Sequence, residues 1–230
     1  MLTTDQIQFL YKFCERHYVR YFDVQVELVD HLAAAIEQEQ EQDPGLNFTL
    51  ALNKVYKGFG ITGFAGVVRE KMQAEQKKNN TRHWNLFLSF FTIPRIAVTC
   101  LVFLLLNLPF YLLNPTDSNI LYLSYCVLAA VFGVVAAIYL SLTVKKPKKQ
   151  LLSLLGFPVF FSVFGIFLQI PNLYFNVLRV FFDTGSAQGL TFQLIVNFFV
   201  TALIVAGLAA IETYKQIYKE AQQKYPLAFQ

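Results

Sequence analysis

The sequence predicts an all-α polytopic membrane protein, with four transmembrane helices preceded by a small cytoplasmic four-helix domain. The chain has 230 residues, of which 55% are hydrophobic and only 15% charged, whereas an average soluble domain carries roughly 25% charged residues. Four long runs are nearly free of charge and have basic flanks. The first 80 residues are different, because they carry 9 basic and 11 acidic side chains and resemble a water-soluble domain.

Residues 1–80 are expected to form four short helices. The first begins with a capping box, in which the Thr3 hydroxyl and the Gln6 amide each satisfy a free backbone N–H group. The second covers about residues 23–42, the third about 49–59 and the fourth about 62–77. Apolar side chains at helical spacing are expected to form the core: Ile7, Leu10, Cys14, Tyr18, Val24, Leu28, Val29, Leu32, Ala35, Ile36, Leu52, Val55, Tyr56, Phe59, Phe64, Val67, Val68 and Met72.

The rest of the chain contains the expected membrane domain, residues 96–211. A helix needs about 20 predominantly apolar residues to cross a bilayer core, and each such run must be helical because backbone groups cannot stay unpaired in lipid. The four runs cover about residues 96–113, 120–144, 151–173 and 190–211. The aromatic segment 81–95 suits an interfacial juxtamembrane helix that enters the membrane near Pro94. Residues 212–230 are expected to form a cytoplasmic tail.

The basic residues predict the orientation of the spans, because positive charge near span ends stays in the cytoplasm. The N-terminus lacks a signal-peptide pattern, so the first span is expected to direct insertion. The sequence therefore predicts a multi-pass protein of the bacterial cytoplasmic (inner) membrane with cytoplasmic N- and C-termini. The lysine clusters favour contact with anionic lipid over nucleic acid. The flanking basic residues are Lys77, Lys78, Arg82, Arg95, Lys145, Lys146, Lys148, Lys149, Lys215, Lys219 and Lys224.

Inside the predicted spans the polar side chains are neutral. Ion-coupled transporters and proton relays usually need ionisable groups at depth, so these residues are expected to make interhelical hydrogen bonds, each worth roughly 0.6 kcal/mol. The three cysteines, widely separated, suggest neither a disulfide framework nor a zinc site. The neutral polar residues at depth are Thr99, Asn107, Ser124, Ser162, Gln169, Asn197 and Thr201.

One group of side chains could carry chemistry: Asp23, Glu27, Asp30 and His31, with His17 nearby. Glu27 and His31 are four residues apart on one helix face, a spacing compatible with metal ligation. The simpler interpretation is a local ion pair beside acids favoured by the helix dipole. No nucleophile or phosphate-binding loop accompanies these residues, so the chain is predicted not to be an enzyme, and no cofactor is expected.

The order Glu27-Leu28-Val29-Asp30-His31-Leu32, with Glu37, Ala51, Val55 and Phe59-Gly60 downstream, is similar to a known pattern. It resembles the N-terminal helical module called HAAS and the related permease-prefix module of bacterial transporter permeases, over about residues 1–75. The chain also resembles uncharacterised membrane proteins of Bacteroidetes-type bacteria. The resemblance implies a regulatory role, since such modules are often encoded beside PadR-type regulators. Glu27, Leu28, His31, Phe59 and Gly60 would then be fold determinants, with His31 tying its helix to a neighbour.

We therefore expect a signalling or regulatory membrane protein whose residues 1–80 bind a protein partner. The alternative is a small transporter or channel component, and a homo-oligomer would suit it, since four spans could pair across a two-fold axis. A third hypothesis is a membrane enzyme acting on lipid, for which His83, Asp183 and Glu212 are the candidate residues. The expected partners are the lipid bilayer and a protein, and no nucleic acid.

Overall fold

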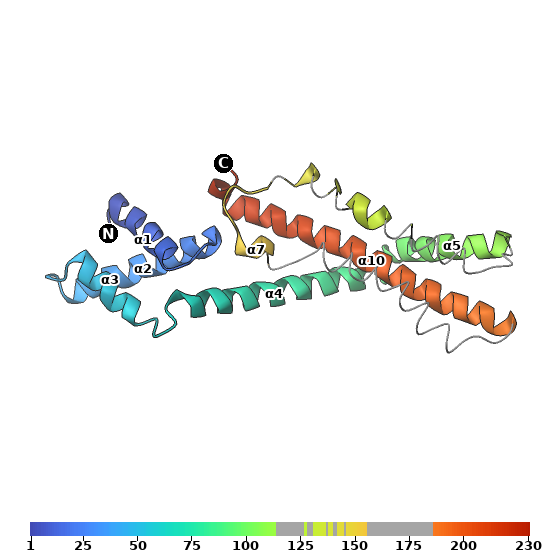
Figure 1. The fold of residues 1–230 in the computed structure, drawn as a ribbon, viewed down its shortest axis with the longest axis horizontal. Helices are drawn as coiled ribbons and strands as arrows, with labels where there is room; N and C mark the ends of the chain where they lie inside the picture. The colour runs from blue at the N-terminus through green and yellow to red at the C-terminus, as the bar shows by residue number, and fades with distance from the viewer. Residues whose placement is uncertain (114–126, 128–130, 137, 140–141, 145, 156–185) are drawn as a thin grey trace. The chain divides into compact units, whose positions relative to one another are not determined.

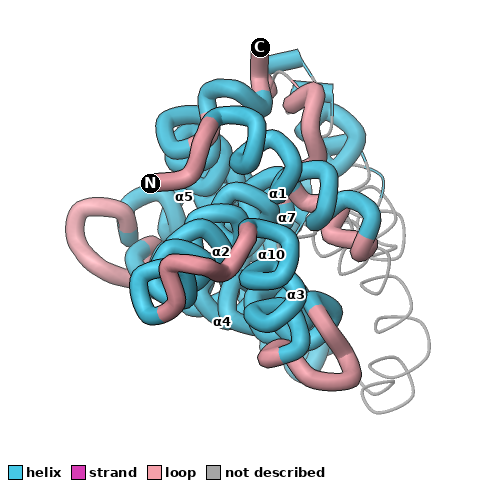
Figure 2. The backbone as a smooth tube through the Cα atoms, turned by 90° about the vertical axis from the view of Figure 1, so that its left-hand side faces the viewer, coloured by secondary structure: helices cyan, strands magenta, loops and turns pink. Residues whose placement is uncertain are grey.

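A computed structural model describes residues 1–113, 127, 131–136, 138–139, 142–144, 146–155 and 186–230. This described part contains helices and loops but no strand (Figure 2), which confirms the all-α prediction for it. The elements (Figure 1) are α1 (Thr4–Arg16), α2 (Phe22–Gln42), α3 (Phe48–Lys57), α4 (Phe64–Ser89), α5 (Ile96–Leu113), α7 (Leu152–Leu155), α10 (Ser186–Lys224) and the short 3-10 helix η2 (Pro226–Ala228).

The chain divides into two compact units. The first, called here the three-segment unit, consists of Met1–Asn79, Lys146–Phe157 and Ile217–Gln230. The second, called the apolar unit, consists of Asn80–Lys145 and Pro158–Gln216. The predicted N-terminal domain therefore lies in the first unit, together with two segments that are distant in the sequence.

The local signals at the ends of α1 and α2 act largely as expected. The capping box is present, with the Gln6 amide nitrogen donating to the Thr3 hydroxyl at 3.3 Å and the Thr3 amide nitrogen donating to Gln6 Oε1 at 2.8 Å. Helix α2 ends at Gln42, and the carboxylate of the next residue, Asp43, accepts from the Gly45 amide. The prediction for Tyr18 was wrong: α1 ends at Arg16, and Tyr18 is exposed in a turn with a φ of 65°.

Helices α3 and α4 are joined by a short turn that depends on glycine. Asn47 caps α3, because its side chain accepts from the Leu50 amide at 2.9 Å. Gly60 has a φ of +72°, a conformation that side chains with a Cβ rarely adopt. The Phe59 ring that precedes it packs edge-on against Phe64 at the start of α4. The turn therefore folds α4 back onto the core.

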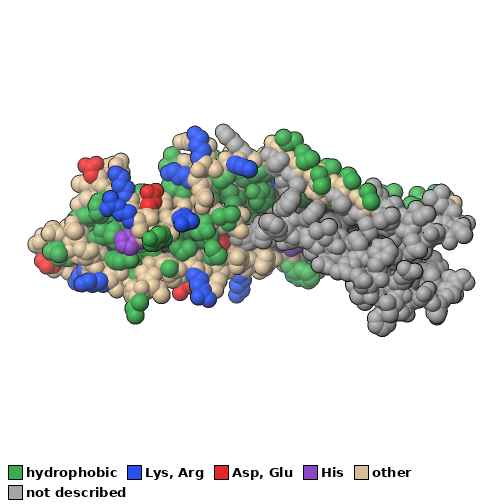
Figure 3. All heavy atoms as spheres, in the orientation of Figure 1, with side chains coloured by type: hydrophobic (Ala, Val, Ile, Leu, Met, Phe, Trp, Pro, Cys, Tyr) green, Lys and Arg blue, Asp and Glu red, His purple; other side chains and the backbone are tan. Residues whose placement is uncertain are grey.

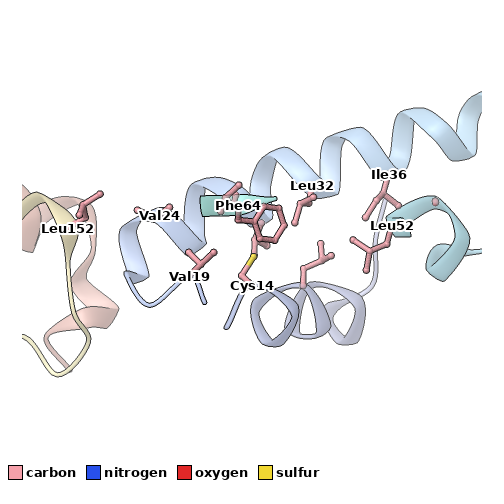
Figure 4. Packing of buried hydrophobic residues seen from close by; sticks show 12 residues of the cluster. Cys14, Val19, Val24, Leu32, Ile36, Leu52, Phe64 and Leu152 are labelled. Atoms are coloured by element: carbon pink, nitrogen blue, oxygen red, sulfur yellow. The ribbon is translucent and has the colours of Figure 1, made fainter. Parts of the chain in front are cut away.

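The core of the three-segment unit lies between α1, α2, α3 and α4. Figure 4 shows Cys14, Leu32 and Phe64 converging from three different helices, and Leu10, Ile36 and Leu52 are also fully buried. Burial raises the pKa of the Cys14 thiol to about 12, so the group acts as a small apolar side chain. Leu152 of α7 belongs to the same cluster. Its amide bonds to the Asp23 side chain, which lies 129 residues earlier in the sequence.

Three expected boundaries differ from the structure. Residues 81–89, predicted as part of a separate interfacial helix, are the last part of α4, which continues to Ser89. The third run was drawn from Leu151, but Leu151 and Leu152 are buried in the three-segment unit. Residues 212–224, predicted as tail, continue α10. These boundaries differ because an apolar run in the sequence does not show which of its leucines pack in a core. Nor does the end of an apolar run show where the helix itself ends.

The first predicted run coincides with α5, at Ile96–Leu113. Within the described residues one helix, Leu194–Lys224, is long and apolar enough to cross a membrane, and a shorter apolar helix covers Ile96–Pro109. The predicted second run is described only in pieces, and the third run lies almost wholly outside the described residues. Four spans therefore stay a prediction.

Large apolar side chains are exposed over the described part of the apolar unit. Leu104 of α5 is 64% exposed and Phe198 of α10 is 55% exposed. Val131, Val135 and Leu142 are also exposed. On the face drawn in Figure 3, acidic and basic side chains occur over α1 to α4, which lie in the three-segment unit as far as Asn79. Soluble monomers rarely expose large contiguous apolar patches.

Candidate interaction site on helix α2

Glu27 lies on α2 and contacts α4. The Lys71 ammonium donates to its carboxylate at 2.7 Å, which ties the two helices together. This hydrogen bond lowers the pKa of the Glu27 carboxyl group, and the positive charges of Lys71, Lys224 and His31 act in the same direction. The sequence predicted a local ion pair for Glu27 on its own helix. It gave no sign of Lys71, because no local pattern indicates a partner 44 residues later.

His31 is exposed and makes no hydrogen bond within the described part of the chain, so it does not tie α2 to a neighbour as expected. Among the described residues there is no cluster of three or more His, Cys, Asp or Glu side chains arranged to hold a metal ion. His17 lies elsewhere, packed in tilted and edge-on contacts with Phe13, Tyr56 and Phe64, with its Nδ1 atom 2.8 Å from the Phe13 carbonyl oxygen. The histidines therefore do not form one site.

Two grooves flank the Glu27–His31 face of α2, and both residues line each of them. The smaller, of about 280 Å³, lies between α2 and α4. The larger, of about 570 Å³, lies between α1, α2 and the end of α10. Its walls are mostly apolar, and its charged groups are acidic Glu27 and Asp30 with basic Lys224. The larger groove is lined by Ile7, Tyr11, Val26, Glu27, Val29, Asp30, His31, Ala33, Lys224 and Tyr225.

The remaining residues of the predicted motif take structural positions. Leu28 is buried in the core, and Phe59 with Gly60 forms the turn described above. Ala51 is fully buried. Glu37 accepts a hydrogen bond from the Leu2 amide at 2.7 Å, which fixes the start of the chain against α2.

Asp23 joins the N-terminal helices to the segment 146–155. Its Oδ1 accepts from the Leu152 amide at 2.9 Å and its Oδ2 from the Ser153 amide at 2.9 Å, so the carboxylate caps the first turn of α7. The side chain is only 4% exposed. The neighbouring Phe22 amide donates to the Gln150 carbonyl oxygen at 2.8 Å. Sequence reasoning assigned Asp23 to the dipole of its own helix and missed this connection.

The end of the chain completes the same unit. The Lys148 amide donates to the Ala228 carbonyl oxygen at 2.7 Å. Phe22 and Leu151 pack in one cluster with Tyr225 and Phe229. The unit is therefore held by contacts among three stretches of sequence that no short-range pattern connects.

In the apolar unit, two polar residues expected to pair between helices do so. The Asn197 side-chain nitrogen on α10 donates to Asn107 Oδ1 on α5 at 2.9 Å, and Asn197 is fully buried. The Asn197 Oδ1 atom is buried and has no hydrogen-bond partner among the described residues. Thr99 bonds to the Phe90 carbonyl oxygen, whereas Thr201 bonds within its own helix to the Asn197 carbonyl oxygen. Ser124, Ser162 and Gln169 lie outside the described residues.

The residues considered for a lipid-active enzyme have other contacts. Glu212 receives two hydrogen bonds from the Arg95 guanidinium, at 2.8 and 3.0 Å. His83 bonds to the Ala209 backbone, and its burial lowers the pKa of the imidazole. Asp183 lies outside the described residues. The arrangement offers no triad in the described part of the chain. No family model, curated protein or solved structure matches this chain.

Proposed function

We propose that this chain is an integral protein of the bacterial cytoplasmic membrane that relays a state of its membrane segments to a protein partner in the cytoplasm. The three-segment unit is the cytoplasmic part, and the apolar unit crosses the bilayer with four spans. The exposed leucines and phenylalanines of α5 and α10 support the membrane placement. The basic residues that flank the apolar runs support cytoplasmic termini.

One observation carries the relay proposal: the three-segment unit contains residues from before, between and after the apolar runs. Helices α4 and α10 each contribute residues to both units. In this proposal, a displacement of α10 along its axis moves Tyr225, which packs in one cluster with Phe22 and Leu151. Packed cores respond to such shifts by switching between discrete arrangements rather than by deforming continuously.

The larger groove is the docking surface in this proposal. Its apolar walls match apolar side chains of a partner segment, and Asp30 matches a basic side chain, because Asp30 is exposed and has no ion pair within the described residues. The occupant is therefore a protein segment that presents apolar residues and a Lys or Arg. Helices bind in such grooves through residues spaced three or four apart.

The relay proposal is tested by capture of partners from native membranes with the tagged full-length chain. Ala33 lines the larger groove and Ala34 is exposed outside it, so Ala33→Arg fills the groove and Ala34→Arg is the matched control. A partner captured by the wild type and by Ala34→Arg, but not by Ala33→Arg, supports the proposal. If the wild type and both variants have the same melting temperature and capture the same partners, the larger groove is excluded as the docking surface.

The membrane placement is tested separately. The protein should stay in membranes at alkaline pH and require detergent for extraction. A fluorescent protein fused after Gln230 should fluoresce, because it folds only in the cytoplasm, and alkaline phosphatase fused there should be inactive. The opposite pair of results refutes the orientation.

The alternative, a small transporter or channel component, has one observation in its favour. The buried Asn197 carbonyl oxygen has no donor among the described residues, although the Asn197 side-chain nitrogen bonds to Asn107. Solute flux into liposomes that Asn107→Leu and Asn197→Leu abolish would favour this function over the relay.

A further inference from the structure

The segment Lys146–Lys149 carries positive charge that no described carboxylate neutralises, on a backbone held by hydrogen bonds. Lys146, Lys148 and Lys149 are all exposed, and residues 146–157 contain no acid. None of the three lysines forms an ion pair with a described carboxylate. The charge is therefore available to an external anion.

The backbone of this segment is held on both sides. The Lys148 and Lys149 amides donate to the Ala228 carbonyl oxygen at 2.7 and 3.3 Å, and the Gln150 carbonyl oxygen accepts from Phe22. Two residues later, the Asp23 carboxylate holds the Leu152 and Ser153 amides. The Lys149 ammonium lies 4.0 Å from the centre of the Phe22 ring, a cation–π contact that restricts this side chain. Less ordering entropy is therefore lost when the Lys149 ammonium binds an anion, and the backbone of Lys148 is already held.

The position of the segment along the chain selects the anion. The apolar run 120–144 ends two residues before Lys146, and a second apolar run follows α7. If both runs span the bilayer, as the proposed function requires, the lysines lie at the cytoplasmic headgroup level. Each such lysine attracts anionic lipid and adds to the binding constant.

We propose that Lys146, Lys148 and Lys149 form a binding site for the phosphate of an anionic phospholipid headgroup in the cytoplasmic leaflet. The bound headgroup then contacts the same segment that Asp23 and Ala228 hold. Lipid composition at the inner leaflet thereby acts on the three-segment unit through its middle segment.

The test uses the full-length chain in a neutral detergent, with short-chain phosphatidylglycerol and phosphatidylcholine as probes and native mass spectrometry as the readout. The wild type should bind phosphatidylglycerol more tightly than phosphatidylcholine. Because three lysines contribute, Lys146→Gln/Lys148→Gln/Lys149→Gln should weaken phosphatidylglycerol binding by about tenfold to a hundredfold at low salt. The triple arginine variant should retain it.

The matched control removes three exposed cations elsewhere in the same unit, as Lys12→Gln/Lys57→Gln/Arg69→Gln. This control should keep the lipid preference. Equal loss in both triple variants, no loss in the lysine-segment variant, or equal competition by inorganic phosphate at the same concentration would overturn the proposal. If the glutamine variant does not fold, wild-type binding that is insensitive to added salt overturns it instead. Membrane extraction is measured separately, so failure of lipid binding and failure of membrane placement are distinguishable.

Discussion

Replacing Asp23 by Asn tests whether one carboxylate holds the three-segment unit together. Asparagine keeps the shape and one acceptor oxygen, so the bond from the Leu152 amide can persist. The second oxygen becomes an NH2 group that faces the Ser153 amide, a donor placed 2.9 Å from another donor. A hydrogen bond to a charged group is worth about 1.5–3 kcal/mol, and a buried donor without a partner costs about 1–3 kcal/mol.

The lost hydrogen bond and the unpaired donor overlap in part, so the two costs do not simply add. Asp23→Asn should therefore lower the free energy of opening the segment 146–155 by about 2–3 kcal/mol. A change of 1.4 kcal/mol is tenfold in an equilibrium constant, so amide hydrogen exchange in this segment should accelerate by roughly 30-fold to 150-fold. The assay is hydrogen exchange of the detergent-solubilised full-length chain, followed in peptides that cover residues 146–155 and 225–230.

The matched control is Asp30→Asn on the exposed face of the same helix, where a surface change should stay within about 0.5 kcal/mol. Exchange in Asp23→Asn that equals exchange in Asp30→Asn would refute the reasoning. Acceleration confined to α2, with none in the segment 146–155, would also refute it, because the carboxylate would then serve only its own helix.

Three further outcomes are expected. Glu27→Gln should lower the melting temperature at about pH 7 only slightly, since exposed ion pairs are worth about 0–1 kcal/mol and Glu27 is 43% exposed. The pKa of the Glu27 carboxyl group is lower in the folded chain than its usual value of 4.5, so the ion pair stabilises the fold above pH 4.5 and is lost as the pH falls through the folded-state pKa. A difference in melting temperature between the wild type and Glu27→Gln that persists at about pH 2.5 would therefore count against the ion pair. Cys14, with a pKa of about 12, should resist alkylation at about pH 8, where roughly one thiol in ten thousand is ionised. Mass mapping of the folded chain against the chain unfolded in dodecyl sulfate checks this, and equal labelling of Cys14 in both contradicts it. A double-mutant cycle with Asn107→Leu and Asn197→Leu should give a coupling of about 0.6 kcal/mol in detergent unfolding, and a coupling near zero contradicts the hydrogen bond.

Local patterns predicted much of the helical content and little of the connectivity. The capping box at Thr3 and the glycine turn at Gly60 depend on neighbours within a few residues, so composition and spacing were sufficient to find them. Helix α5 begins at the expected Ile96 and covers the expected run as far as the description extends, to Leu113, because such a run must be helical in lipid. Tyr18 was misplaced because helical spacing continues past the residue where the helix ends.

The candidate site was less predictable. Glu27 and His31 were named as neighbours on one face, and that much follows from the helix period. Their actual surroundings, including Lys71 and Lys224, come from α4 and α10 and depend on tertiary packing. The bond between Asp23 and Leu152 could not be found for the same reason, since a leucine in an apolar run gives no sign that its backbone is capped from a distant helix.

The connection between Asp23 and residues 152 and 153 has a consequence for biosynthesis. When the ribosome has made the first four helices, the carboxylate of Asp23 has no partner from α7, because those amides are synthesised 129 residues later. The Ala228 carbonyl oxygen, which receives Lys148, is made later still. The unit therefore closes only after the apolar runs have left the ribosome, and it closes only when all three segments have been delivered to the same compartment. In the proposed topology, an insertion error that translocates the middle segment would leave Phe22 and Asp23 without these contacts, and quality-control proteases could act on that surface.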